Sequence, residues 1–134
     1  MMAMFTLAKS LRWFLMLFYG LAGVLHILLP APFLSILPAW VPWPLPTIIF
    51  TGVCEIAGAV GLLIPATRKA AGIGLAAYAI AVFPANINHA IIDLGNAHPT
   101  LGWLYHGPRF LLQPILVWAA LYGAEVTRWP FRKT

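Results

Sequence analysis

One carboxylate, that of Glu55, lies in the middle of a long run of apolar and small residues, Thr47–Ile64. At ~1.5 Å per residue this run makes about 27 Å of helix, enough to cross a hydrocarbon core about 30 Å thick with help from flanking residues. An ionisable group at that depth is costly, and it usually faces a bundle interior or a watery cavity where it has a partner. Glu55 is therefore the first candidate for a functional residue.

The other apolar runs carry polar side chains as well: His26, Asn86, His89, Arg109 and Gln113. When both chain termini are placed on one side of a membrane, the helical rise puts Glu55 roughly 12 Å below the opposite surface, and it puts His26, Asn86 and Gln113 roughly 5 to 8 Å below it. Four runs that bring polar groups to one level predict a pocket that opens outward with Glu55 at its floor. The alternative is a hydrogen-bond network that only holds the helices together.

A carboxylate close to an imidazole in apolar surroundings suits proton transfer, because the two groups can share a proton near neutral pH. We therefore predict that His26 lies within hydrogen-bonding reach of Glu55 and that these two are the catalytic residues. Such a pair would serve the protonation of a quinone-like molecule. The residues expected to bind this ligand are Asn86, His89, Arg109, Gln113, Trp40 and Tyr19.

Metal binding is a weaker interpretation of the same polar groups. Suitable ligand types are present in His26, Glu55, His89 and His106. No helix carries a local ligand spacing such as H-x-x-x-H, so no metal is predicted. Cys54 is the only cysteine, which excludes an intrachain disulfide and a Cys-x-x-Cys redox pair. Redox chemistry would need an external electron carrier.

Composition indicates which elements must position these residues. Of the 134 residues, 62% are hydrophobic and 8% are charged, and the mean hydropathy is +0.89. Soluble domains of this size do not have such a composition. The sequence predicts an all-α integral membrane protein, one domain over residues 1–134 that forms a four-transmembrane-helix bundle. The helices are expected at about 11–29, 47–64, 70–91 and 108–126.

The net charge of +5 comes from residues at the ends of the apolar runs, which indicates topology and lipid headgroup contact rather than nucleic-acid binding. These basic residues are Lys9, Arg12, Arg68, Lys69, Arg128, Arg132 and Lys133. Both termini are therefore expected in the cytoplasm, with the two long loops outside a membrane that we expect to be a bacterial inner membrane. The first run is expected to be an uncleaved helix, since no convincing cleavage site follows it.

The segment from Pro30 to Pro46 has six prolines among aliphatic and aromatic residues. The prolines exclude a regular helix, yet the segment is too apolar for a free linker. Because tryptophan prefers the headgroup region, we expect this segment along the membrane surface or folded over the bundle as a lid. The alternative is a connector that the prolines stiffen.

Helix spacing predicts which faces look inward. Tyr19, Gly23 and His26 fall on one face of the first helix, and small residues surround Glu55 in the second, so both faces should pack against neighbouring helices. Pro84 should kink the third helix, because it lacks a backbone donor and leaves a carbonyl one turn back free for a side chain, water or ligand.

The chain contains the stretches GVLHILLPAPFLSILPAWVPWP, TGVCEIAGAVGLLIPATRKAAG, VFPANINHA and PRFLLQPILVWA. Together they resemble the DoxX-like family of small four-helix membrane proteins, over nearly the whole chain from Gly20 to about Ala119. The resemblance implies a four-helix bundle. Some members are subunits of thiosulfate:quinone oxidoreductases, others accompany oxidative-stress or methylamine-oxidation systems, and distant animal relatives assist receptor assembly. The resemblance assigns no catalytic residue to this chain.

Two functions from different classes stay open. In the first, the chain is an oxidoreductase subunit in the membrane that binds a quinone-like or other apolar small molecule in its outward-facing pocket. In the second, it is a non-catalytic assembly factor or chaperone for a partner membrane protein. Whether the chain itself is an enzyme is left open. Besides the lipid bilayer, the expected partner is a membrane or redox protein or a second copy of the chain, and not nucleic acid.

Overall fold

The computed structural model describes residues 2–131, except for the side chain of Met4. Within this part the chain forms helices and no strands. The helices are α1 (Met2–Leu28), α2 (Ala31–Ile36), α3 (Pro44–Leu63), α4 (Arg68–Ala81), α5 (Phe83–Leu94) and α6 (Trp103–Gly123). Arg132 and Lys133, two of the basic residues used for the predicted topology, lie outside the described residues.

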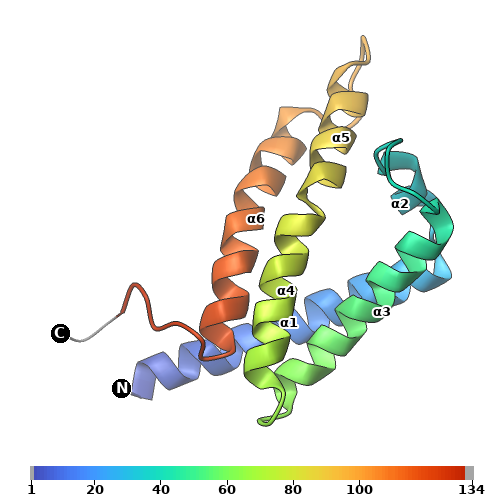
Figure 1. Ribbon diagram of the computed structural model, residues 1–134. Coiled ribbons are helices and arrows are strands. Elements are labelled where there is room, and N and C mark those ends of the chain that lie inside the picture. The colour runs from blue at the N-terminus through green and yellow to red at the C-terminus, as the bar shows by residue number, and fades with distance from the viewer. Residues whose placement is uncertain (1, 132–134) are drawn as a thin grey trace.

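The long helices are arranged as two pairs, as Figure 1 shows. α1 lies beside α3, and α4 lies beside α6, with the two pairs crossing near the end of the molecule where both termini lie. α3 also packs on α4, and α1 on α6, so the four helices close a ring at the crossing. Beyond it, α5 and the first part of α6 diverge from α3, and α2 lies at the far end of α3.

The core lies where the two pairs cross. It consists mainly of leucine and alanine: Leu15, Leu62, Leu75, Leu116, Ala59, Ala76, Ala79, Ala119 and Ala120. Small residues let the helices approach closely. A Cβ atom on Gly58 would lie 2.5 Å from Leu75 Cδ2, and one on Gly72 would lie 2.1 Å from the Cβ of Ala124. Packing of this kind is the main source of helix association in lipid, where the hydrophobic effect between helices is absent.

An ion-pair network joins three helix ends on the terminal side of the core. The Arg12 guanidinium donates to the carbonyl of Gly123 at 2.9 Å and to Glu125 Oε1 at 2.7 Å. Arg68 donates through Nε to the carbonyl of Leu62 at 3.1 Å, and its Nη1 lies 3.8 Å from the same Glu125 oxygen. Arginine thus satisfies carbonyls that the helix ends leave without an intrahelical partner.

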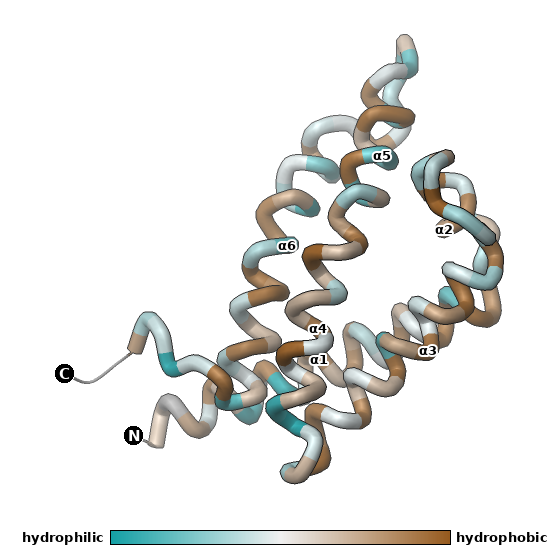
Figure 2. Tube along the Cα trace, in the orientation of Figure 1, coloured by the Kyte–Doolittle hydropathy of each residue, from teal (hydrophilic) through white to brown (hydrophobic). Residues whose placement is uncertain are grey.

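Three segments are long and apolar enough to cross a membrane: Phe5–Leu28, Pro44–Leu63 and Arg68–Leu94. The third comprises α4 and α5 together. Figure 2 shows hydrophobic residues recurring along these helices, with a strongly hydrophilic stretch near the turn between α3 and α4. The structure is therefore compatible with an integral membrane protein, and the predicted fourth span is not among the three segments. α6 has 21 residues but contains histidine, arginine, glutamine and two prolines.

Several predicted helix boundaries were wrong. α1 begins at Met2 and not near residue 11, and α3 begins at Pro44 and not at Thr47. Proline costs nothing in a first helical turn, whose N–H groups have no intrahelical acceptor, so Pro44 and Pro46 start α3 where we expected loop. α6 begins at Trp103 and contains Pro108, which we expected at its start.

The prediction that residues 30–46 contain no regular helix was also wrong. α2 forms there over six residues, with Pro32 in its first turn. The carbonyl of Pro30 accepts hydrogen bonds from the amides of Phe33 and Leu34 at 3.1 and 3.0 Å, so this proline starts the helix. A proline-rich segment excludes helix only where the prolines fall beyond the first turn.

The predicted kink at Pro84 is confirmed. The third apolar run is broken at Val82 into α4 and α5, and Pro84 stands in the first turn of α5. The backbone of Val82 stays close to helical, with φ −87° and ψ −6°, so the two helices continue in one general direction.

Candidate functional site

The crossing of α1 and α3 brings two backbones into direct contact. A Cβ atom on Gly23 would lie 2.6 Å from the carbonyl oxygen of Gly52, and one on Gly52 would lie 2.8 Å from the carbonyl oxygen of Gly23. Real Cβ atoms do not come this close to backbone oxygens. Only glycine therefore fits at these two positions without moving the helices apart.

Each of these glycines makes room for the polar residue of the opposite helix. His26 follows Gly23 by three residues and Glu55 follows Gly52 by three, so each pair shares one helix face. The Cβ of His26 would lie 2.8 Å from a Cβ on Gly52, and the Cβ of Glu55 would lie 3.1 Å from one on Gly23. The reciprocal arrangement places His26 Nδ1 2.6 Å from Glu55 Oε2. The predicted contact between these residues is confirmed.

The contact leaves one carboxylate oxygen without a well-directed hydrogen bond. His26 Nδ1 also lies 2.9 Å from the carbonyl oxygen of Ala22, one turn earlier in α1. A single Nδ1 proton can be directed at only one of these two acceptors. Glu55 Oε2 is buried and has no partner of acceptable geometry, although His26 Nδ1 is near. We take the 2.6 Å separation as a close contact, because an N–H directed at Ala22 points away from Oε2.

Aromatic and hydroxyl side chains surround the pair. Glu55 is 3% exposed. The ring of Phe33, from α2, stacks on the imidazole of His26 with 3.8 Å between ring centres. On the other side, the Tyr78 hydroxyl lies within hydrogen-bonding range of Glu55 and Thr51. The carboxylate thus has an imidazole and a phenol as neighbours, and the phenol has an aliphatic hydroxyl beside it. All three are groups that can donate or accept a proton.

A second polar group is built on the break between α4 and α5. Gln113 Oε1 accepts from Arg109 at 2.9 Å and from Asn86 at 3.2 Å. The side-chain amide of Gln113 donates to the carbonyl of Ala79, close to the break at Val82. This carbonyl lies five residues before Pro84, whereas the missing proline donor frees the carbonyl four residues back, that of Ile80. Three of the predicted ligand-binding residues therefore lie together.

Tyr19 connects this group to the first. It is 3% exposed, and its ring packs edge to face on that of Tyr78 with 6.0 Å between centres. It lies close enough to both Glu55 and Arg109 to be influenced by their charges. The predicted inward face of the first helix is confirmed, since Gly23 is buried as well and His26 contacts Glu55.

Two predicted ligand-binding residues lie elsewhere. Trp40 is 73% exposed on the segment after α2. His89 packs its ring against His106, with 5.0 Å between centres, and against Tyr105. Within the described residues, neither forms a hydrogen bond or ion pair with Glu55 or Gln113. His89 shares the α5 helix with Asn86, and spacing alone did not show that their neighbours differ.

His89 adjoins a second buried carboxylate and imidazole that we did not predict as a site. Asp93 is 7% exposed and His106 is 1% exposed, with 3.1 Å between Asp93 Oδ2 and His106 Nε2. The Asp93 oxygens also accept from the backbone amides of Thr100, Leu101 and Gly102 at 2.8 to 3.3 Å. The signal in the sequence was an aspartate at the end of an apolar run, followed by a short polar loop. Over the described residues, no three His, Cys, Asp or Glu side chains come close enough to hold a metal ion.

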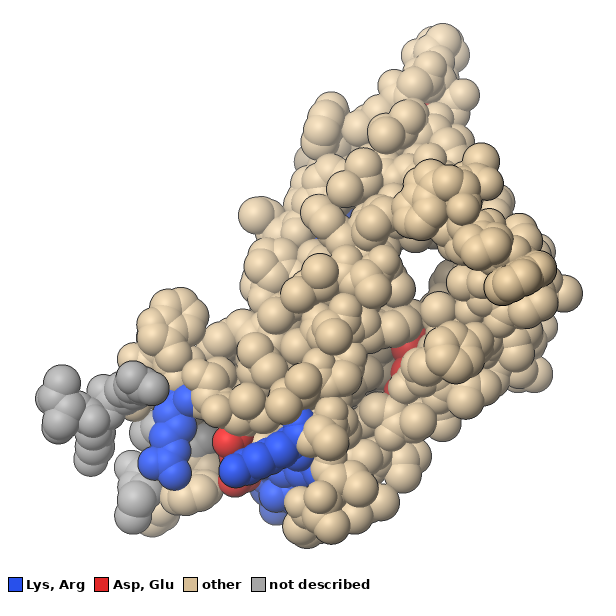
Figure 3. Space-filling view, in the orientation of Figure 1, with Lys and Arg blue, Asp and Glu red and all other residues tan. Residues whose placement is uncertain are grey.

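The space-filling view in Figure 3 shows an opening through the molecule, between α4 and α5 on one side and α2 and α3 on the other. A hydrogen bond joins α5 to α2, from the side-chain amide of Asn88 to the carbonyl of Ile36 at 2.7 Å. α2 therefore covers His26 through Phe33 and is tied to α5 through Ile36. This is the position that the predicted lid would take.

The chain belongs to the family described as "Domain of unknown function (DUF8561)", whose model matches residues 15–124. The matched stretch contains both buried carboxylates and all of α2 to α6. No curated protein and no solved structure matches the chain. The resemblance to the DoxX-like family has no counterpart in these findings and stays a prediction from the motifs.

Proposed function

We propose that the chain is the membrane subunit of a redox system, and that it binds a quinone-type molecule whose proton is exchanged at the Glu55–His26 pair. The observation that carries the proposal is the buried Oε2 of Glu55, which receives no well-directed hydrogen bond although His26 Nδ1 lies 2.6 Å away. A buried carboxylate oxygen without a hydrogen-bond donor is costly, and such groups are kept mainly where a ligand or a reaction uses them. The hydroxyl of a quinol is a donor of the kind that this oxygen lacks.

Proton transfer at this site follows from the neighbours of Glu55. When a quinol is oxidised, it loses two protons and two electrons and becomes the quinone. Glu55 Oε2 accepts the first proton from a quinol hydroxyl and passes it to His26 Nδ1, 2.6 Å away, in the tautomer whose N–H is on Nε2. The second proton then stays on Glu55, so that the pair takes up both. The electrons pass to a partner redox protein, because Cys54 is the chain's only cysteine and offers no dithiol pair. Reduction of a quinone runs the same steps backwards.

The Gln113 group would hold the other end of the ligand head. Arg109 has five N–H donors and uses one of them on Gln113 Oε1, so others can bind a quinone oxygen. Asn86 and Arg109 both donate to the same Gln113 oxygen, which fixes the position of all three side chains. Tyr19 lies near the charges of both groups. A ligand head bound between Arg109 and Glu55 would have one of its two oxygens bound by each of these residues.

The proposal includes α6 as a fourth membrane span. Its 21 residues correspond to about 31 Å of helix, and it packs along α4 and α1. The basic residues Arg12 and Arg68 meet at one end of the molecule, the end that we assign to the cytoplasm. α2 and the loop after α5 then face outward.

Labelling from the two sides of the membrane tests this topology. In a Cys54→Ala background, cysteines at the exposed positions Ser35 and Asn96 should react with an impermeant maleimide added outside intact cells. A cysteine at Lys69, an exposed position in the first turn of α4, should react only after the cells are opened. The reverse pattern would contradict the proposed orientation.

Two measurements test the proposed function. Solvent extraction of the purified protein should release a stoichiometric quinone or quinol, identified by mass spectrometry. Titration with a water-soluble quinol, followed by tryptophan fluorescence, should show saturable binding that Glu55→Gln weakens about tenfold or more, as expected for the loss of a charge-assisted hydrogen bond. Gly20→Leu is the matched control, since a side chain there meets no neighbouring atom within 4 Å. A stoichiometric protein partner with no quinone would favour the assembly factor instead.

A further inference from the structure

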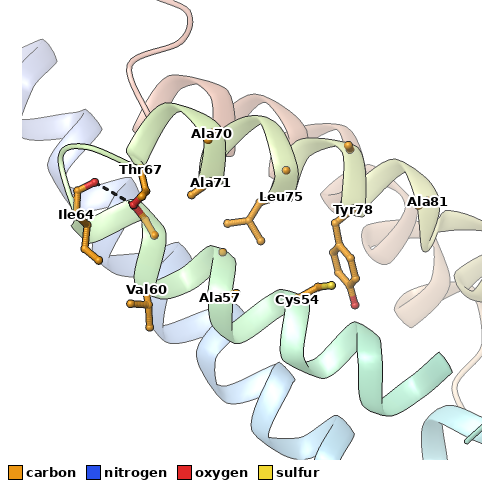
Figure 4. Close-up of a pocket in the computed structure, with 14 residues that line it drawn as sticks. Cys54, Ala57, Val60, Ile64, Thr67, Ala70, Ala71, Leu75, Tyr78 and Ala81 are labelled. Atoms are coloured by element: carbon orange, nitrogen blue, oxygen red, sulfur yellow. Dashed lines mark hydrogen bonds between the residues drawn. The ribbon is translucent and has the colours of Figure 1, made fainter. Parts of the chain in front are cut away.

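A groove of about 860 Å³ runs between α3 and α4, within the size range of small-molecule sites. Figure 4 shows how its lining residues lie. The walls consist of small and aliphatic residues, among them Ala57, Ala70, Ala71 and Ala81. From Ile64 to Cys54 the groove follows α3 for ten residues, about 15 Å. The walls are apolar along this length, and polar side chains stand only near the two ends.

The polar groups at the end near the turn already have partners. The Thr67 hydroxyl lies 3.0 Å from the carbonyl of Gly61 and 3.4 Å from that of Ile64. The neighbouring Arg68 donates to the carbonyl of Leu62, and it lies near Glu125. This end therefore offers little to a polar head such as a phosphate.

The other end leads to Glu55. Figure 4 shows Tyr78 reaching from α4 toward α3 beside Cys54, across the end of the groove. The Tyr78 hydroxyl lies within hydrogen-bonding range of Glu55, whose Oε2 is buried and without a partner. Tyr78 is thus a wall of the groove and a neighbour of the carboxylate at once. An apolar tail lying in the groove would bring the group attached to it at the Tyr78 end against this hydroxyl.

We infer that the groove holds the apolar tail of the ligand whose head binds at Glu55, so that a long-chain quinol enters sideways from the bilayer, past Tyr78. The inference rests on the proposed function and adds the tail, its position and the route of entry. The tail lies parallel to lipid acyl chains, so that bilayer and groove are equally apolar surroundings for it. The groove therefore contributes to binding through its shape and not through greater hydrophobicity, because it gives the tail a place to lie when the head is bound at Glu55.

Two quinols that differ only in their tails test the inference. Gly74 lines the groove, and a Cβ atom there would meet no neighbouring atom within 4 Å, so Gly74→Leu is expected to project into the groove without disturbing the helix packing. In nanodiscs, Gly74→Leu should weaken binding of a decyl-tailed quinol about tenfold or more, and should leave a tailless quinol with its wild-type affinity. Gly20→Leu is the control, because a Cβ atom at Gly20 on α1 also meets no atom within 4 Å. It should leave the affinity for both quinols unchanged, and the melting temperatures of both variants should match the wild type.

The outcomes separate the two proposals. If wild type binds neither quinol, the proposed function fails. If it binds both, and Gly74→Leu binds the tailed one as tightly as wild type does, the groove inference fails while the proposed function stands. A diazirine at the tail end supplies a direct check, because it should label the groove wall between Ile64 and Ala71. Labelling on α6 or on a second copy of the chain would overturn the inference.

Discussion

Two buried carboxylate–imidazole pairs occur in this chain, and they differ in how fully the carboxylate is satisfied. Asp93 accepts from three backbone amides and lies 3.1 Å from His106 Nε2. Glu55 has His26 at 2.6 Å and still keeps one oxygen without a directed partner. The same residue types serve two purposes. A saturated carboxylate holds a loop in place, and one with a free oxygen can accept something new.

The positions of the two pairs agree with this distinction. Asp93 stands at the end of α5 and fixes the start of α6 through Gly102, whose φ of +64° turns the chain. Glu55 lies inside α3, where the backbone is already held by the helix and needs no anchor from a side chain. A carboxylate that is not needed for the fold is available for function. Substitutions can test this difference between Asp93 and Glu55.

The largest effect is expected from Gly52→Leu. Its side chain would meet the Gly23 backbone and His26, so α1 and α3 must separate, and the free energy of unfolding should fall by about 3 kcal/mol or more. Thermal unfolding followed by circular dichroism in detergent measures this. Hydrogen exchange at Thr100 and Gly102 should be unchanged, because the Asp93 anchor is built on other helices. Faster hydrogen exchange in that loop as well would contradict the proposed difference between the two carboxylate sites.

A smaller loss of stability, about 2 to 3 kcal/mol, is expected from Asp93→Asn, because an amide has one acceptor oxygen where the carboxylate has two and brings an N–H₂ group among amide donors. Hydrogen exchange at the amides of residues 100–102 should speed up. Binding of a tailless quinol should stay near its wild-type affinity. A loss of binding together with an intact loop would make Asp93 part of the binding site.

Glu55→Gln should have the smallest effect on stability, within about 1 kcal/mol of wild type, since glutamine keeps the size and hydrogen-bonding capacity of the side chain. Its effect should be on function. Quinol binding or turnover, measured from about pH 5 to pH 8, should weaken and lose its pH dependence, because glutamine cannot take up a proton. A stable variant with a normal pH profile would show that Glu55 only joins helices.

What could be predicted from the sequence was mostly contained within single helices. Fixed spacing placed Gly23 and His26 on one face, and the missing donor of Pro84 predicted the break at Val82. Proximity of His26 to Glu55 followed from the cost of leaving a carboxylate alone in an apolar run. Each of these conclusions needs only local geometry or one energetic rule.

What could not be predicted depends on where separate elements meet. Asp93 binds amides seven to nine residues away, in a loop whose path no periodicity describes. The position of Phe33 over His26 depends on a short helix in a segment where the prolines suggested none. His89 and Asn86 stand three residues apart on α5, yet the segments packed beside them differ, so they have different neighbours.

The contact between Gly23 and Gly52 has a mechanical consequence. Membrane helices adapt to bilayers of different thickness by tilting. Two helices whose backbones touch at one point tilt about that point as about a pivot, so their ends move most and the residues beside it move least. His26 and Glu55 lie one turn from this pivot. The distance between imidazole and carboxylate should therefore stay nearly constant from one membrane to another, while the loops at the helix ends change their spacing.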